Sequence, residues 1–380
     1  MNALNPSMPP ALPTSPASSK PHPERIQFLD GLRGIAILMV VLFHAYVRWA
    51  DLYPYGSRFT EVPAFAYGML GVQLFFIISG FVIFMTLEKC TTFLSFMLKR
   101  WLRLFPAMLI CSLFIFLTAA WFAERPAGSP VLRDMLPGLS FVEPYVWSKL
   151  LGSPQGVLEG VFWSLYVEVK FYLLFGLMYF GLGGRNAIIA LSLLFFAGAF
   201  ASLAPQLGIN IVAGMWQHLA TLLFWSGAGY YGWFAAGALY FKFFQKKNSA
   251  YLALAITLAC MAALARGGSM AEMVAALAVV LVFTVVIASE RVKKLVQMPA
   301  LAWIGLISYP LYLLHENLMV AMIIKIGKFA PWIPAILMPA LPILIVIALA
   351  ALVAQAAEPW FRQWLRTGIA RIAPRLAAAS

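Results

Sequence analysis

Apolar blocks of about 20 residues recur along almost the whole chain, separated by short polar segments. A block of this length, coiled as an α-helix, crosses a hydrocarbon core about 30 Å thick. The composition agrees: 63% of the residues are apolar, 11% are charged and the mean hydropathy is +0.87. Soluble domains are about 45–50% apolar and about 25% charged. We therefore expect an all-α, polytopic transmembrane helix bundle and exclude a water-soluble globule.

The spacing of the apolar blocks predicts ten spans, at roughly 31–50, 65–87, 104–123, 163–181, 186–204, 219–241, 249–265, 271–289, 302–324 and 333–357. Positive residues are retained on the cytoplasmic side, and a cytoplasmic N-terminus places most of the 27 Lys and Arg residues there. Both termini are then cytoplasmic, as expected for a multi-pass protein of the bacterial inner membrane. The external loop at about 124–162 is the longest and has room for a substrate-covering element.

Three segments follow from this pattern. Residues 1–24 are rich in Pro and Ser and are predicted to form a disordered cytoplasmic tail. Residues 25–360 form the transmembrane domain, and residues 361–380 a short basic cytoplasmic tail. The first block is too long and too polar for a cleaved signal peptide.

The net charge of +13 does not predict nucleic-acid binding. The cations lie in short segments between apolar blocks rather than on one basic face, so the lipid bilayer is the expected partner. The three cysteines form no C-x-x-C pair and predict neither disulfides nor a metal site. The four histidines lie on four separate segments without ligand spacing, so no metal is expected.

Ionisable side chains inside the predicted spans are candidates for functional groups, because lipid makes them costly. Arg33 and His44 are eleven residues apart, which is about three helical turns, so they share one face of the first span about 16 Å apart. A core histidine bonded to a neighbouring helix is the structural alternative for His44.

Glu168 in the fourth span is predicted to lie at nearly the same depth as His44. A carboxylate beside the imidazole would fix its tautomer and raise its basicity, as a general base requires. Alternatively, Glu168 is a structural partner for Lys170 or an arginine. Lys170 is only two residues away and does not face Glu168 on a helix, so it needs a different partner.

A basic run, Lys99, Arg100 and Arg103, lies at the predicted cytoplasmic mouth of the third span. It is either a topology signal alone or a phosphate clamp, because Arg100 and Arg103 share a helix face and arginine forks bind phosphate bidentately. Further polar residues at the spans are candidates for substrate contacts or for helix packing: Asp30, Gln73, Ser79, Trp163, Ser164, Tyr309 and His315.

With these residues in place, the chain resembles the acyltransferase-3 family of integral membrane O-acyltransferases nearly end to end. The resemblance is carried by five blocks in the same order: 29–34 leading to His44, 71–81, 99–106, 163–172 with Glu168, and 307–315. Lys170 departs from the family, in which this position is often neutral and polar. Some relatives carry a C-terminal extracytoplasmic hydrolase-like domain, and this chain is expected to be a stand-alone member without one.

The resemblance implies transfer of an acyl group, usually acetyl, from cytoplasmic acyl-CoA to a hydroxyl of a carbohydrate, a glycolipid or another envelope molecule. It implies that His44 is essential and that Arg33, Arg100 and Arg103 serve the donor. We expect His44, oriented by Glu168, to deprotonate the acceptor hydroxyl, with an acyl-histidine intermediate as an open alternative. Trp163, Ser164 and Tyr309 are candidate oxyanion donors.

Two other classes of protein fit the same residues. A proton-coupled transporter could use His44 and Glu168 as an intramembrane relay. A scaffold subunit of an envelope-polymer machine would tolerate loss of His44. The sequence leaves the acceptor open among lipopolysaccharide O-antigen, exopolysaccharide, a glycolipid and a small metabolite.

Overall fold

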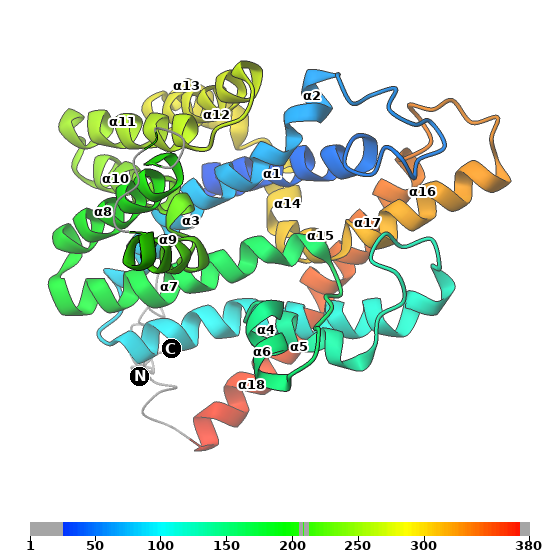
Figure 1. Ribbon diagram of the computed structural model, residues 1–380, viewed down its shortest axis with the longest axis horizontal. Helices are drawn as coiled ribbons and strands as arrows, with labels where there is room; N and C mark the ends of the chain where they lie inside the picture. Colours follow the sequence, from blue (N-terminus) through cyan, green and yellow to red (C-terminus); the bar gives the residue numbers. More distant parts are fainter. Residues whose placement is uncertain (1–25, 205–207, 209–212, 373–380) are drawn as a thin grey trace, which may run out of the picture.

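The computed structural model describes residues 26–204, 208 and 213–372, and within them the chain is built from helices without strands. Figure 1 shows the helices in chain order. Their bounds are α1 Gln27–Tyr46, α2 Pro63–Ala66, α3 Gly71–Leu87, α4 Phe93–Thr118, α5 Met135–Ser140, α6 Pro144–Leu151, α7 Trp163–Leu182, α8 Gly184–Leu203, α9 Ala213–Ser226, α10 Tyr231–Lys246, α11 Ser249–Ala265, α12 Met270–Ala288, α13 Glu290–Val296, α14 Pro299–Leu306, α15 Ser308–Leu314, α16 Asn317–Phe329, α17 Ala340–Leu352 and α18 Glu358–Ile372. The predicted tail at 1–24 lies outside the described residues.

Seven helical segments of the described chain are long and apolar enough to cross a membrane. They are Gln27–Tyr46, Pro63–Leu87, Phe93–Trp121, Gly160–Leu182, Gly184–Leu203, Met270–Ala288 and Ala340–Arg371. Each overlaps one of the ten predicted spans, so the all-α polytopic fold class is confirmed, although Phe93–Trp121 begins well before the predicted 104 and Ala340–Arg371 ends well after the predicted 357. The orientation of the bundle remains a prediction.

The other three predicted spans are not long continuous helices. Ser249–Ala265 is an apolar helix of 17 residues. The expected span at 219–241 is broken at Gly227, whose φ of 83° lies in the left-handed region that glycine adopts without a steric penalty. The expected span at 302–324 is divided at Ile307 and again at His315–Glu316 into α14, α15 and α16. Here the prediction of one helix was wrong, because an apolar run does not reveal where a helix stops.

Helix α1 lies among α3, α14 and α15 and carries the first two ionisable candidates into the bundle. Close approach to α14 depends on glycine: a Cβ at Gly305 would stand 1.8 Å from the backbone oxygen of Asp30. Helix α3 meets α10 in the same way, since a Cβ at Gly237 would stand 2.1 Å from the oxygen of Ile77. Small residues at such crossings let backbones pack closely where lipid supplies no hydrophobic drive between helices.

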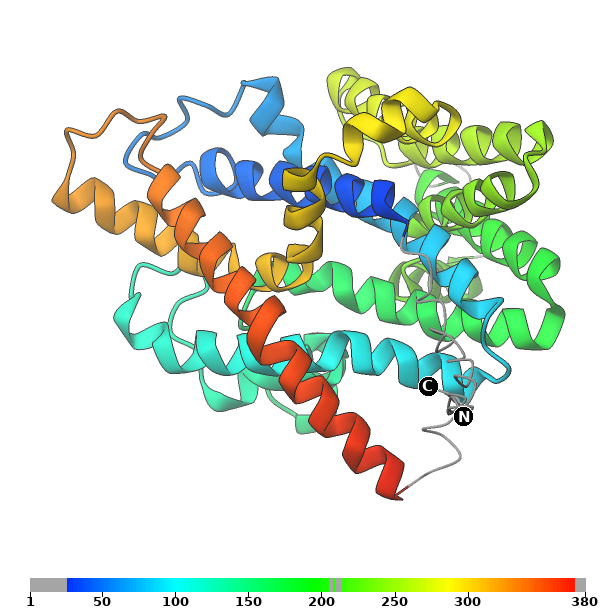
Figure 2. The same ribbon diagram turned by 180° about the vertical axis from the view of Figure 1, so that it is seen from behind.

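The last helical segment, Ala340–Arg371, runs without interruption through a π-helical turn at Val353–Ala357. Figure 2 shows it as one long rod, with α18 passing beside the start of α4. At 1.5 Å per residue, its 32 residues span about 48 Å, which exceeds a hydrocarbon core of about 30 Å. It is therefore longer than a helix needs to be to cross such a layer.

Candidate active site

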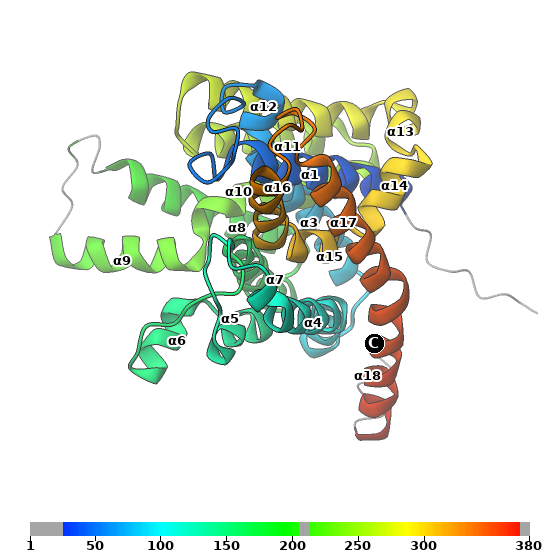
Figure 3. The same cartoon turned by 90° about the vertical axis from the view of Figure 1, so that its right-hand side faces the viewer.

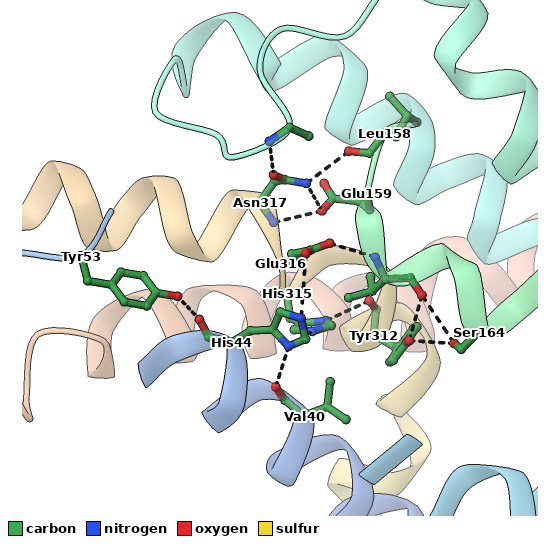
Figure 4. A network of polar contacts seen from close by, with 12 residues as sticks. Val40, His44, Tyr53, Leu158, Glu159, Ser164, Tyr312, His315, Glu316 and Asn317 are labelled. Carbon is green, nitrogen blue, oxygen red and sulfur yellow. Dashed lines mark hydrogen bonds and ion pairs between the residues drawn. The ribbon is translucent and has the colours of Figure 1, made fainter. Parts of the chain in front are cut away.

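The break between α15 and α16 brings a second histidine and a carboxylate to His44. His315 and Glu316 occupy the two positions between these helices, and both are buried. His44 lies near the C-terminal end of α1, and its ring is 4.7 Å from that of His315, centroid to centroid, and nearly perpendicular to it. Figure 4 shows the three side chains converging with Tyr312. A continuous helix would have pointed His315 and Glu316 in directions about 100° apart.

Backbone carbonyls fix the tautomer of both rings. His315 Nδ1 lies 2.9 Å from the oxygen of Tyr312, and His44 Nδ1 lies 2.9 Å from the oxygen of Val40. A carbonyl oxygen only accepts, so both Nδ1 atoms carry the proton and, in the neutral rings, both Nε2 atoms carry a lone pair. His44 Nδ1 is also 3.3 Å from His315 Nε2, so its proton is shared between two acceptors. Of the two Nε2 lone pairs, that of His315 faces the His44 Nδ1 proton. The lone pair that remains free to accept a proton is therefore on His44 Nε2.

Glu316 faces this lone pair. Its Oε1 is 3.9 Å from His44 Nε2, while its Oε2 accepts a hydrogen bond of 2.9 Å from the backbone N–H of Val161. Gly160 leaves room for this carboxylate, since a Cβ there would approach it to 3.1 Å. A negative charge at this distance favours the protonated imidazole and so assists proton uptake by His44.

A buried polar network ties the segment between α4 and α7, which contains the loop predicted to be external, to the same break. Asn317 donates to Glu159 Oε2 from its backbone N–H at 2.9 Å and from its side chain at 2.6 Å. Arg125 pairs with Glu159 at 3.5 Å and donates to the oxygen of Leu158 at 2.8 Å. Burial, and then the neighbouring charge of Glu316, raise the pKa of Glu159 to about 8. These contacts hold Leu158 and Glu159 in place, close along the chain to Val161, whose N–H binds Glu316.

Within the part of the chain that the structure describes, Glu168 does not make the expected contact with His44. Its Oε1 accepts hydrogen bonds from Ser79 at 2.7 Å and from Tyr172 at 2.6 Å. Helix α7 turns Glu168 toward Ser79 of α3 and toward the cavity that Arg33 lines. The position beside the imidazole is taken by Glu316, which the helix break supplies.

Three cavities follow one another on the side of the predicted cytoplasmic mouth. One of about 250 Å³ is lined by Lys99, Arg100 and Arg103, together with Arg362 and Arg366. A second of about 540 Å³ is lined by Arg33, Arg103 and Arg362, among others. The third, of about 100 Å³, is lined by Arg33, Arg100, Arg103, Ser164, Glu168 and Tyr312, among others. Arg103 lines all three, so the cavities adjoin one another.

The innermost cavity reaches the histidines through Tyr312. The Tyr312 ring lies beside that of His315, with 5.5 Å between centroids. Its hydroxyl donates to the oxygen of Val161 at 2.9 Å and lies 2.7 Å from the hydroxyl of Ser164. Of the candidate oxyanion donors, Ser164 lines this cavity, whereas Trp163 lines a different one. Tyr309 also lines it, but its hydroxyl donates to the oxygen of Leu104 at 3.0 Å.

Helix α18 supplies two cations that the sequence analysis placed in the basic tail at 361–380. Arg362 and Arg366 are one helical turn apart and join Arg100 and Arg103 around the outermost of the three cavities. On the opposite face, Trp360 and Trp364 are 70% and 62% exposed, as is typical of aromatic residues at a membrane interface. Glu358 pairs with Arg103 at 3.5 Å and with Arg362, and so fixes α18 to α4.

The remaining predicted residues have the following places. Asp30 is buried and its carboxylate is 3.9 Å from Arg33. Gln73 lines a large cavity together with Trp163. Lys170 pairs with Glu143 of the external loop at 2.7 Å, which supplies the different partner that its helical position required.

Glu316 was the main residue that sequence reasoning missed, although a signal was present. His315, Glu316 and Asn317 are three consecutive polar residues in an apolar run. Such a cluster is costly inside a continuous membrane helix and indicates a break. No comparable local signal connects Arg362 and Arg366 with Arg103, because 255 positions separate Arg103 from the helix that carries them.

Together, these features define a polytopic helical membrane protein in which Tyr312 separates two buried histidines from a cavity lined by three arginines. Residues 26–357 match the family model of an acyltransferase domain. The chain therefore belongs to this acyltransferase family.

Two of the similar curated proteins are O-acetyltransferases by name. The O-acetyl transferase of Shigella phage Sf6 is 25% identical over 208 residues, which cover 52% of this chain and 60% of the phage protein. O-acetyltransferase OatA of Staphylococcus aureus is 29% identical over 168 residues, which cover 41% of this chain and 25% of OatA. The chain thus spans less than two thirds of the length of either relative. No solved structure gives a significant match.

Proposed function

We propose that this protein is an O-acetyltransferase of the bacterial inner membrane that moves an acetyl group from cytoplasmic acetyl-CoA to a hydroxyl of an envelope carbohydrate or glycolipid. The observation that carries the proposal is Arg103, which lines each of three adjoining cavities between the cation cluster and Tyr312. The names of the relatives from a phage and from Staphylococcus support acetyl as the group transferred.

The donor binds at the cation cluster formed by Lys99, Arg100, Arg103, Arg362 and Arg366. The phosphates of coenzyme A carry several negative charges, and arginine forks bind phosphate oxygens through paired N–H donors. The Nε atoms of Arg100 and Arg362 are buried without a hydrogen-bond partner, which leaves donors available to an anion. The pantetheine arm, which is narrow and mostly uncharged, follows the cavities inward past Arg33.

At the histidines, His44 Nε2 takes the proton of the acceptor hydroxyl while the hydroxyl oxygen attacks the thioester carbon. The C–S bond breaks as the new C–O ester bond forms. The imidazolium then returns its proton to the departing sulfur, so coenzyme A leaves as the thiol. Glu316 stabilises the imidazolium in between, and Tyr312 holds His315 beside it. Glu168, with Ser79 and Tyr172, acts at the donor cavity rather than on the base.

Purified protein in liposomes, given acetyl-CoA labelled in the acetyl group, tests the function. The measurements are release of coenzyme A thiol and recovery of label in an added carbohydrate acceptor. We expect thiol release to depend on the acceptor and to match the label transferred. Proton flux without consumption of acetyl-CoA would contradict the proposal and favour a proton-coupled transporter.

A further inference from the structure

A large cavity lies on the other side of α7 from the helices that hold the histidines. It measures about 900 Å³ and is lined from α7, α8, α9 and α10, with Gln73 contributed by α3. Figure 3 shows α9 at one edge of the bundle, where it forms the outer wall. The volume falls within the range of about 300–1,000 Å³ that is usual for ligand pockets. Neither the donor nor the catalytic residues use this space.

One wall of the cavity is aromatic. Trp163 lines it from α7, Tyr230 from the 3-10 turn Ala228–Tyr230, Trp233 from α10 and Trp225 from the end of α9. The rings of Trp163 and Tyr230 lie 5.4 Å apart at an angle of 43°, so they form two faces of a corner. The negative face of an aromatic ring attracts the weakly positive C–H groups on the flat side of a sugar ring.

Polar residues also line the cavity, and one of their buried polar atoms lacks a partner. Gln73 is 6% exposed, lines the cavity, and its amide oxygen makes no hydrogen bond within the described protein. Leaving a buried acceptor unpaired is costly, so such a group is expected to meet a donor supplied by a ligand. The ion pair of Lys170 with Glu143 lies at the same cavity and offers further polar contacts.

The cavity shares a wall with the innermost donor cavity. Trp163 and Ser164 are consecutive on α7 but line different cavities. Phe76 lines the donor cavity, and its ring packs against Trp163 at 6.4 Å and against Tyr230 at 5.5 Å. A molecule in the large cavity would therefore be one side chain away from the space assigned to the donor.

We infer that this cavity binds the acceptor through a sugar ring, which stacks on Trp163 and Tyr230 and donates a hydroxyl hydrogen bond to Gln73. The inference rests on the proposed O-acetyltransferase function and adds to it the place of the second substrate. A lipid chain alone does not match the cavity, since a half-buried ion pair and an unpaired amide give an alkyl chain nothing to bind and are costly against it.

Direct binding to the protein in nanodiscs tests the inference without relying on turnover. The probes are methyl β-glucoside as a free sugar, octyl β-glucoside below its micellar concentration as a lipid-linked sugar, and 1-octanol as the chain alone. Quenching of tryptophan fluorescence reports binding, because three of the lining residues are tryptophans. We expect a glucoside to bind and 1-octanol to bind much more weakly. Binding of methyl β-glucoside indicates a free glycan acceptor, and binding of octyl β-glucoside alone a lipid-linked one.

The variants are Gln73→Leu and Trp163→Ala, with Thr284→Val as the matched control. Thr284→Val removes a hydroxyl that is hydrogen-bonded to Tyr240 between α12 and α10, and neither residue lines the cavity. Gln73→Leu and Trp163→Ala should each weaken glucoside binding about 10-fold or more and leave the Kd for acetyl-CoA unchanged, whereas Thr284→Val should change neither. Equal binding of 1-octanol and octyl glucoside, or unchanged glucoside binding in Gln73→Leu, would overturn the inference. Absence of thiol release by the wild type would instead overturn the proposed function, so the two failures are separable.

Discussion

His44 Nε2 and Glu316 Oε1 face one another across 3.9 Å in a buried site. The tautomer set by Val40 leaves the lone pair of His44 on the nitrogen that Glu316 faces. At this distance, and with an effective dielectric constant of about 20, a full pair of charges attracts by about 4 kcal/mol. The attraction exists only after His44 has taken a proton, so it stabilises the state that general-base catalysis creates.

Replacement of His44 tests the base directly. We expect His44→Ala to abolish acetyl transfer while membrane insertion and thermal stability stay close to those of the wild type, because an apolar helix accepts alanine. Transfer of labelled acetyl by the purified variant is the measurement. His218→Ala, at an exposed histidine of α9, serves as the control and should keep full activity. Turnover by His44→Ala would remove His44 from the mechanism.

Glu316→Gln keeps the shape of the side chain and removes its charge. The variant should lower kcat by about 10- to 1000-fold with little change in the Kd for acetyl-CoA, because the charge acts on the imidazolium rather than on the donor. Glu124→Gln is the matched control, since Glu124 pairs with Lys325 and Lys328 in the external region. A weaker Kd with an unchanged kcat would place Glu316 in donor binding.

A substitution that conserves charge tests the arginine side chains at the outermost of the three cavities. Arg100→Lys together with Arg103→Lys keeps every positive charge and so keeps the topology signal. Lysine lacks the planar pair of donors, so affinity for acetyl-CoA should fall measurably while the KM for the acceptor stays near that of the wild type. Calorimetry at fixed, moderate salt measures the affinity. An unchanged Kd would show that these residues serve topology alone.

Arg362 and Arg366 should contribute to the same site from α18. Arg362→Gln with Arg366→Gln is expected to weaken acetyl-CoA binding about 10-fold or more and to reduce the dependence of the Kd on salt, since screening acts on the charges that were removed. Arg371→Gln, on the same helix but not at the cavity, is the control. If the control and the double variant bind alike, α18 has no part in donor recognition.

The environment of Glu159 predicts a dependence of stability on pH. Its pKa is raised to about 8 by burial and by Glu316, so the folded protein retains a proton that the unfolded chain releases near pH 4–5. The contribution is therefore present at low pH and lost as the pH rises through about 8. Thermal unfolding between pH 5 and pH 9 should show the wild type losing stability relative to Glu159→Gln. Parallel curves for the two proteins would contradict the shift.

The sequence was sufficient for the fold class and for most of the arginines that line the proposed donor cavities. Apolar blocks of membrane-spanning length predict helices wherever the run is continuous, because hydrocarbon leaves the backbone no other partner than itself. The basic run at Lys99–Arg103 and the arginine on the first span were found in the same way, since charges in apolar surroundings stand out. Arg33, Arg100 and Arg103 do line a common cavity.

The tertiary structure decided which residues lie next to one another. Glu168 and Glu316 are both carboxylates near apolar runs, and sequence position ranked Glu168 first by depth alone. Depth is one coordinate, whereas contact also requires the right helix, the right face and, for His315 and Glu316, a helix that stops. The path of α18 beside α4 depends on packing between segments far apart in the chain, which no local pattern encodes. The polar run at 315–317 signals a helix break, but it does not show that Glu316 then meets His44. The sequence by itself therefore determined a helical membrane protein with a costly histidine in its first span, and only the packing of α14–α18 determined which charges surround it.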